Sequence, residues 1–256
     1  MNQWIKIDKS IYSKTNCTDI VIWNSYPTIG SNLGLNKLTK YIRDITYIPE
    51  YHLSIFVGLL LSDGGLSKQK KSKNARFALK QSMIHFPFLW STFMLLSHYC
   101  SSVPYIDNYK LDKKIYYGIR METRAYSCLT VLFNLFYMPV GPSKDKFKKI
   151  VPLDIYNLLT PVALAYLIMG DGNGNAWKGL YLCTDSFTDY DIVRLMNVLL
   201  IRYSVKSRLV QVSGKSRIYI SSSESYKINN LVFEHIHPSM AYKILGQYPL
   251  KNNNDK

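Results

Sequence analysis

The stretch FVGLLLSDG at residues 56–64 returns about a hundred residues later as LAYLIMGDG at residues 164–172. Each copy is an apolar run that ends in Asp-Gly, which predicts a buried helix with a carboxylate at its C-terminal end. An acid at that end of a helix faces the negative end of the peptide dipole, which costs a few tenths to about 1 kcal/mol unless a cation lies beside it. The two acids, Asp63 and Asp171, therefore indicate a bound divalent metal.

The composition indicates a polyanionic partner. The chain has 32 Lys and Arg against 17 Asp and Glu, a formal net charge of +15, which is typical of proteins that bind nucleic acid. Its hydrophobic content of 47% excludes a disordered basic tail. A chain of 256 residues can form one large domain or two fused halves, and the repeat favours two halves. No apolar run approaches the roughly 20 residues that span a bilayer, so we expect no membrane partner.

The N-terminal segment has neither the apolar core of a secretion signal nor an Arg-rich amphipathic import sequence. Lys, Asn, Ile and Tyr are abundant, with 21 Tyr, as expected of an AT-rich coding sequence. We therefore expect the protein to be encoded in an organelle and to work where it is made, in the mitochondrial matrix.

The first half of the chain has a readable order of elements. Residues 1–45 lack periodicity and contain turn-forming residues, which favours an extended N-terminal arm. Apolar residues at i, i+3, i+4, i+7 and i+8 predict a helix from Pro49 to near Asp63. The patterns that follow predict a strand at 75–82, a helix at 88–99, a strand at 116–122 and a helix at 127–138.

The second half repeats this order. Thr160 and Pro161 are an N-cap and a first-turn proline, and they predict a helix to Asp171, followed by a turn at 173–175. A strand at 180–186, a helix at 190–203, a hairpin of 208–212 with 217–221, and a helix at 226–235 follow. The predicted organisation is a first half at 46–138, a linker at 139–157, a second half at 158–245 and a flexible tail at 246–256.

Two helices of this kind pack most simply side by side, which would bring Asp63 and Asp171 together. Like charges a few ångströms apart raise a carboxylate pKa or require a cation between them. Mg²⁺ prefers carboxylates, waters and phosphate oxygens, and the carbonyls of Ser62 and Gly170 would complete such a set of ligands. The cluster suits metal-assisted phosphodiester hydrolysis. A single Asp-Gly after an apolar run is more often an ordinary helix end, and the second copy is what favours function.

Basic and polar residues alternate with apolar ones in the predicted hairpins. Alternation directs one set of side chains outward, where it would form a basic ribbon suited to the major groove of DNA, with its cations on phosphates. One basic loop alone could equally be solvated surface, but similar segments recur in both halves. The predicted DNA-binding residues are Lys68, Lys70, Lys71, Lys73, Arg76, Lys80, Lys113, Lys114, Arg120, Arg124, Lys178, Lys206, Arg208, Lys215 and Arg217.

The doubled motifs resemble those of the LAGLIDADG homing endonucleases, specifically the single-chain two-repeat type encoded in organellar group I introns, over about residues 50–245. The resemblance implies an α+β fold of two αββαββα halves about a pseudo-twofold axis. In that fold the motif helices pack at the centre and saddle-shaped antiparallel sheets lie on DNA. The resemblance also implies that both aspartates bind metal together with the carbonyls of Ser62 and Gly170.

The family usually has one basic residue near the metal in each half. By position, Lys149 and Lys243 resemble these residues, although each could also be a surface lysine. Two positions depart from the family's pattern, because Ser62 and Tyr166 stand where small residues are commoner; Gly58 is the counterpart of Tyr166. A tyrosine at the helix interface predicts asymmetric packing, and neither departure alters the aspartates.

The function that this resemblance implies is a site-specific endonuclease that makes a double-strand break with 3′ overhangs in a long asymmetric DNA target. A monomer would suffice, with Mg²⁺ as cofactor, Mn²⁺ able to substitute and Ca²⁺ supporting binding without cleavage. The alternative is an RNA maturase that assists splicing of its own group I intron. A third reading is a DNA-binding protein without activity. Retention of both acids favours the enzyme, since an RNA binder has no use for a metal pair.

Overall fold

The computed structural model describes residue 33 and residues 37–69, 72–111, 114–141, 146–175 and 179–245. The first half consists of α3 (Glu50–Leu60), β1 (Gly65–Ser67), β2 (Arg76–Ser82), η2 (Met83–His85), α4 (Phe86–Leu96), η3 (Ser97–Tyr99), β3 (Tyr105–Leu111), β4 (Lys114–Glu122) and α5 (Ser127–Phe136). It is preceded by α2 (Lys40–Ile45) and followed by β5 (Tyr137–Val140), β6 (Lys146–Lys149) and α6 (Ile155–Leu158).

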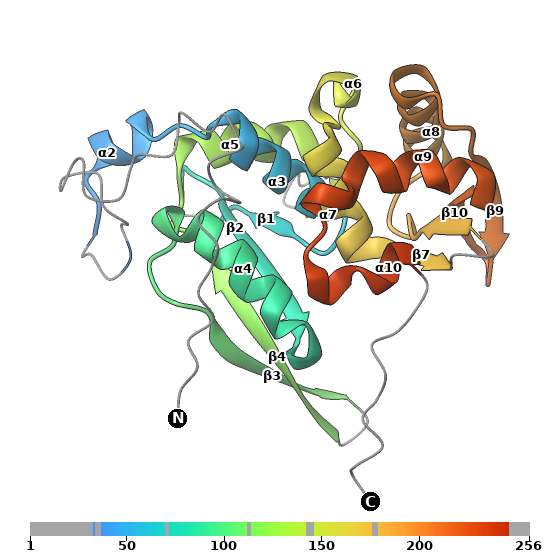
Figure 1. The fold of residues 1–256 in the computed structure, drawn as a ribbon. Helices are drawn as coiled ribbons and strands as arrows, with labels where there is room; N and C mark the ends of the chain where they lie inside the picture. Colours follow the sequence, from blue (N-terminus) through green and yellow to red (C-terminus); the bar gives the residue numbers. More distant parts are fainter. Residues whose placement is uncertain are drawn as a thin grey trace, which may run out of the picture. The chain divides into compact units, whose positions relative to one another are not determined.

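The second half consists of α7 (Pro161–Asp171), β7 (Gly172–Asn175), β8 (Gly179–Leu182), α8 (Asp189–Tyr203), β9 (Arg208–Val212), β10 (Lys215–Ile220), α9 (Ser222–Val232), η4 (Phe233–His235), η5 (Pro238–Met240) and α10 (Tyr242–Leu245). Both halves contain a four-stranded antiparallel sheet, in the orders β1-β2-β4-β3 and β7-β8-β10-β9. The α+β class and the order helix, hairpin, helix, hairpin, helix are therefore confirmed (Figure 1).

Helices α3 and α7 pack against each other, with the first sheet beside α3 and the second beside α7 (Figure 1). Helix α7 begins where the sequence predicts, because the Thr160 hydroxyl accepts a hydrogen bond from the backbone N–H of Ala163. Both helices are apolar on nearly every side, and their buried residues join one hydrophobic core. The two motifs thus form the centre of the fold.

The interface between α3 and α7 is asymmetric, as the sequence predicts. A Cβ added at Gly58 would lie 2.3 Å from the carbonyl oxygen of Ala163 and 2.6 Å from Cβ of Tyr166. The tyrosine ring packs beside Phe88, with ring centroids 6.0 Å apart. Glycine on α3 therefore leaves the space that the tyrosine of α7 requires.

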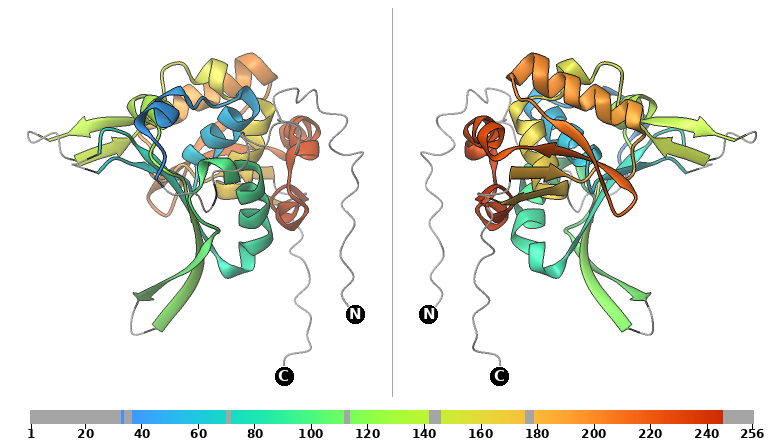
Figure 2. Two further views of the ribbon diagram at one scale, coloured as in Figure 1. Left: turned by 90° about the vertical axis from the view of Figure 1, so that its left-hand side faces the viewer. Right: turned by 90° about the vertical axis from the view of Figure 1, so that its right-hand side faces the viewer.

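Amphipathic helices cover one face of each sheet. Helices α4 and α5 contact the first sheet, and α8 and α9 contact the second. In β2 the buried residues alternate with partly exposed ones, so the opposite face of this sheet is open. The β3–β4 hairpin extends beyond the neighbouring helices (Figure 2). Within the described residues, no helix is long and apolar enough to cross a membrane.

Several predicted boundaries are wrong. Residues 40–45 of the expected extended arm form helix α2, whose N-terminus is capped by Thr39; six residues are too few to show a period. Helix α3 ends at Leu60, three residues before the predicted end near Asp63, because the N–H groups of Ser62 and Gly64 both bond to the Leu59 carbonyl and close a turn that contains Asp63.

Three further segments differ around the hairpins. The predicted helix at 127–138 ends at Phe136, because residues 137–140 pair with 146–149 and turn the start of the expected linker into a hairpin. Residues 173–175 are not a turn but lie in β7, since cross-strand pairing with β8 overrides the weak strand propensity of Asn and Gly. Strand β8 ends at Leu182, four residues before the predicted boundary at 186. The expected tail at 246–256 and arm residues 1–32 lie outside the described residues.

Candidate active site

The ends of the two motifs meet at the C-terminal ends of α3 and α7. Asp63 is exposed in the turn after α3, whereas Asp171 is the last residue of α7. A Cβ added at Gly170 would lie 2.4 Å from Oγ of Ser62 and 3.4 Å from Oδ2 of Asp63. The structure therefore brings together the four residues proposed from sequence as metal ligands.

The electrostatics of Asp171 reflect this crowding. Burial raises the pKa of its carboxyl to about 7, and the neighbouring charge of Asp63 acts in the same direction. Lys243 and Lys149 oppose the shift. A carboxyl that is poorly solvated and lies beside a second acid is stabilised in its charged form by a cation.

The two lysines singled out from sequence lie in this cluster. The Lys149 ammonium, at the end of β6, donates to the carbonyl oxygens of Ser62 at 3.1 Å and Gly64 at 2.8 Å. The Lys243 ammonium, on α10, donates to the carbonyl oxygen of Gly170. Burial lowers the pKa of Lys149 to about 8 and also lowers that of Lys243. Helix α10 contacts β7, which places its lysine at the end of α7.

Gln81 is a site residue that the sequence analysis missed. Its Nε2 donates to Oδ2 of Asp63 at 2.7 Å, and it is buried at the end of β2. The equivalent inward position of the second half, two residues after the buried Leu182, is Thr184, whose hydroxyl instead donates to the carbonyl of Ser216 at 2.9 Å. A polar residue at an inward position of a strand was the signal that could have identified Gln81.

His85 is also close to this cluster, and no pattern in the sequence pointed to it. Its ring stacks on Tyr242, with ring centroids 6.5 Å apart and an interplanar angle of 14°. Burial lowers the pKa of His85, Lys243 lowers it further, and Asp63 raises it. The histidine of η2 in the first half therefore lies against the α10 segment that carries a lysine of the site.

The donor set fits a hard divalent cation. Two carboxylates and the carbonyls of Ser62 and Gly170 are oxygen ligands of the kind that Mg²⁺ accepts, with waters and phosphate oxygens completing the shell. These carbonyl oxygens already accept hydrogen bonds from ammonium groups, so they are oriented to stabilise a positive charge. Within the described ranges no group of three or more His, Cys, Asp or Glu residues gathers.

Basic residues on the open face of the first sheet are held in an ion-pair network. Lys80 pairs with Asp107 at 2.9 Å, Arg120 donates to Glu122 at 2.8 Å, and Arg76 lies 3.4 Å from Glu122. Neither acid, Asp107 or Glu122, was predicted from the sequence. Partly exposed pairs of this kind add little stability, but they fix the direction of the cations and lower the net charge of the face.

The second sheet orients its basic residues differently. Arg217 makes a two-pronged contact with Asp185, at 2.9 and 3.1 Å, and Lys215 lies 3.0 Å from the same carboxylate. The Arg208 guanidinium lies over the ring of Tyr219, 5.4 Å from its centroid. This stacking leaves the edge of the Arg208 guanidinium available to a ligand, whereas the edge of the Arg217 guanidinium is occupied by Asp185.

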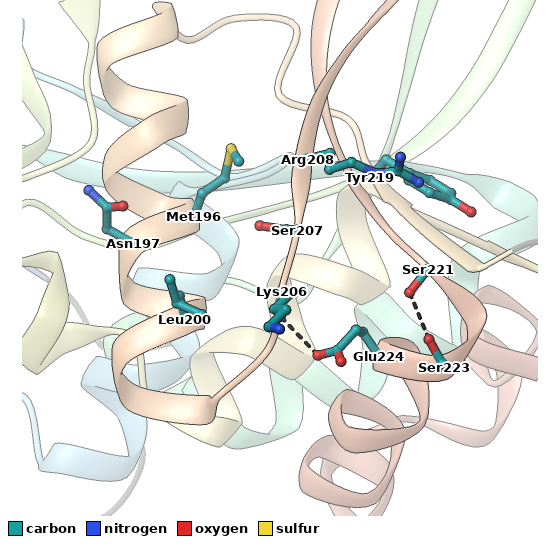
Figure 3. Close-up of a pocket in the computed structure, with 10 residues that line it drawn as sticks. All are labelled: Met196, Asn197, Leu200, Lys206, Ser207, Arg208, Tyr219, Ser221, Ser223 and Glu224. Carbon is teal, nitrogen blue, oxygen red and sulfur yellow. Dashed lines mark hydrogen bonds between the residues drawn. The ribbon is translucent and has the colours of Figure 1, made fainter.

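Arg208 and Lys206 also line a groove of about 640 Å³ between α8, the start of β9 and the start of α9 (Figure 3). Of the remaining predicted DNA-binding residues, Lys68 and Lys73 are exposed, Lys114 begins β4, and Arg124 lines a polar pocket of about 290 Å³ with Arg76. Lys70, Lys71, Lys113 and Lys178 lie outside the described residues.

Comparisons with known proteins agree with this arrangement. The profile of the LAGLIDADG DNA endonuclease family matches residues 53–228. The cytochrome b mRNA maturase bI2 of Saccharomyces cerevisiae is 30% identical over 224 residues, which are 85% of this chain and 52% of the relative. Its namesake in Debaryomyces hansenii is 30% identical over 202 residues, 77% of this chain and 74% of the relative. This chain thus spans about half the length of the first of these relatives.

A solved structure shares the fold. The homing endonuclease I-WcaI, bound to its DNA recognition sequence, matches with a TM-score of 0.73 and 24% identity, over 87% of this chain and 100% of that one. Since the family profile covers more than half of the 256 residues and includes both motifs, the chain belongs to the LAGLIDADG DNA endonuclease family.

Proposed function

We propose that the protein is a site-specific homing endonuclease that makes a double-strand break with 3′ overhangs in a long asymmetric DNA target. The observation that carries this proposal is the convergence of Asp63 and Asp171 with two backbone carbonyls and two half-buried lysines. Such a cluster can hold cations against a phosphodiester, and the fold is one in which I-WcaI has been seen on DNA.

The residues of the cluster take distinct roles in this hydrolysis. A divalent metal bound by both aspartates would polarise the phosphate and acidify the attacking water. Gln81 fixes the orientation of the Asp63 carboxylate through its 2.7 Å hydrogen bond. The ammonium groups of Lys149 and Lys243 supply positive charge where the phosphate gains negative charge, and both are partly withdrawn from solvent.

The cofactor proposed is Mg²⁺, with Mn²⁺ able to replace it and Ca²⁺ supporting DNA binding without cleavage. One chain carries both aspartates and both lysines, so a monomer would be sufficient for a complete site. We also propose that the chain divides into an N-terminal arm at 1–45, two halves at 46–138 and 158–245 joined by a linker at 139–157, and a tail at 246–256. Two relatives of this chain are named cytochrome b mRNA maturases, and we propose an organellar, mitochondrial location.

The DNA interface proposed is the open face of both sheets. The cations there would bind phosphates, and Tyr, Ser, Asn and Gln side chains on the same strands would read base edges in the major groove. The I-WcaI structure supports this only at the level of the fold, since the two chains are 24% identical.

The test is cleavage of duplex DNA. The protein, in Mg²⁺, is incubated with a duplex that spans the uninterrupted insertion site of its own intron, and the products of each strand are resolved. We expect double-strand breaks with 3′ overhangs, and binding without breaks when Ca²⁺ replaces Mg²⁺. Tight binding that never leads to cleavage in Mg²⁺ or Mn²⁺ would contradict the proposal.

The second candidate function is RNA maturation, because both relatives that are 30% identical are named maturases. A maturase would bind its group I intron and speed splicing without needing both acids. The same preparation is therefore assayed for splicing of the intron transcript. Splicing that survives Asp171→Asn, in a protein that never cuts DNA, would favour this function; a protein that does both is bifunctional.

A further inference from the structure

The metal ligands expected at the motif ends are already engaged by the protein's own cations. Lys149 donates to the carbonyls of Ser62 and Gly64, and Lys243 donates to the carbonyl of Gly170. The lone pairs of such a carbonyl oxygen point toward the ammonium group, as they would point toward a bound metal ion. The ammonium group therefore occupies the place that the metal would take.

Each ammonium also links the two halves. Lys149 bonds to carbonyls of the first motif, and the carboxylates of both motifs favour its charged form. Lys243 bonds to a carbonyl of the second motif, and both carboxylates favour its charged form as well. Each lysine is therefore hydrogen-bonded to one motif and attracted by the acids of both halves.

Charge counting shows why these positions matter. Two carboxylates and two ammonium groups make the cluster neutral when all four are ionised. A divalent cation added beside both ammonium groups would leave the cluster with an excess of two positive charges in a partly buried site, which is costly. The cation and the ammonium groups therefore compete for the same oxygens.

We propose that Lys149 and Lys243 are internal counter-cations that occupy the metal positions in the metal-free protein and leave the backbone carbonyls when a divalent metal binds. This inference rests on the proposed metal-dependent function and goes beyond it, because it makes the lysines competitors of the metal before they become its partners. Lys149 holds two carbonyls and Lys243 one, so displacement is expected to be harder on the side of Lys149.

Ca²⁺ binding to the intact, DNA-free protein tests the proposal without any activity measurement. Isothermal titration calorimetry is carried out on the wild type, Lys149→Met, Lys243→Met and the control Lys148→Met, whose side chain is exposed on the same strand as Lys149. We expect both active-site variants to bind Ca²⁺ about tenfold more tightly than the wild type, with the larger gain for Lys149→Met. The control should leave the affinity unchanged.

The metal-free variants should also be less stable, since the two carboxylates then share a single ammonium group, and Ca²⁺ should raise their melting temperatures more than that of the wild type. Lys149→Gln serves if Lys149→Met melts below the assay temperature, because its amide can still donate to the carbonyls without a charge. A smaller tightening is expected of it, because the charge is removed while the carbonyls can still be engaged.

Ca²⁺ affinity that is unchanged or weaker in both active-site variants would overturn the inference, because the lysines would then support the metal rather than compete with it. That result leaves the proposed function standing if the wild type cuts DNA. A wild type that neither binds Ca²⁺ nor cuts its duplex would instead remove the proposed function.

Discussion

Asp63 lies in the turn that follows α3, whereas Asp171 is the last residue of α7. The first receives a hydrogen bond from Gln81, and the matching residue of the second half, Thr184, is bonded to a strand carbonyl instead. The lysine beside the first motif contacts two carbonyls and the lysine beside the second contacts one. The repeat thus preserves the backbone frame, while the surroundings of each acid have diverged, so the two halves are expected to contribute unequally.

The helix interface is where this difference should have its largest effect. Gly58→Ala would place a methyl group 2.3 Å from the Ala163 carbonyl, and neither backbone can move without disturbing the core. We expect a loss of about 3 kcal/mol in the free energy of unfolding, measured by urea denaturation. Tyr166→Phe, on the opposite helix, should lose less than about 1.5 kcal/mol, and equal effects would show that the interface is symmetric.

The next effect concerns the stability of the metal-free protein against pH. Because burial raises the pKa of Asp171 to about 7 from 3.8, the folded state holds this proton more tightly than the unfolded state. The free energy of unfolding should therefore fall as pH rises from about 4 to about 7, by on the order of 2 kcal/mol from this group. Thermal melts in a metal chelator measure it, and Asp171→Asn should flatten this window.

Asp185, a second acid of the same half, behaves in the opposite sense. Its hydrogen bond with Arg217 lowers its pKa to about 2, so its contribution is present above about 4 and is lost as pH falls towards 2. Asp185→Asn should leave the window between pH 4 and 7 unchanged. A melt series in which Asp171→Asn has no effect there would contradict the burial argument.

The hydrogen bond to Asp63 predicts a smaller, kinetic difference between the halves. Gln81→Ala should slow cleavage about tenfold, because the carboxylate loses the donor that orients it. Thr184→Ala removes the matching side chain of the second half, whose hydroxyl is already engaged, and should slow cleavage much less. Single-turnover assays with each strand labelled measure both, and nicked product should accumulate with Gln81→Ala; equal rates for the two variants would argue that the halves are equivalent.

The smallest effect is expected on the open faces of the sheets. Arg208→Ala removes a cation that stacks on Tyr219, and it should reduce the slope of log affinity against log salt by about 1. Arg217→Ala removes one that is engaged by Asp185 and should change the slope less. Filter binding of the target duplex at several salt concentrations in Ca²⁺ gives both slopes, and a reversed order would show that the Asp185 pair opens on DNA.

The parts of the fold that could be predicted from sequence are those that local patterns determine. The apolar period of the motif helices, the Thr160 cap and the turn between β9 and β10 are all properties of short segments. The hairpin of β5 and β6 and the strand β7 depend on pairing with distant residues, which outweighs the local preferences of Pro, Gly and Asn.

The candidate site divides in the same way. Asp63 and Asp171 could be predicted from the sequence, because an apolar run that ends in an acid seldom occurs twice in one chain. Gln81 and His85 could not be predicted in this way. Their place in the site depends on where β2 ends relative to α10, the helix of the second half that carries Lys243. The ion pairs of the predicted DNA-contacting cations could not be predicted either, because they depend on the strand register. The acids in these pairs are Asp107, Glu122 and Asp185.

The central claim is that Asp63 and Asp171 form one shared catalytic centre rather than two separate ones. The most direct test is strand-resolved cleavage of the target duplex in Mg²⁺ by Asp63→Asn and Asp171→Asn, with binding of each variant confirmed in Ca²⁺. We expect that each substitution alone abolishes cleavage of both strands while DNA binding persists. Variants that each still cut one strand at the wild-type rate would contradict it.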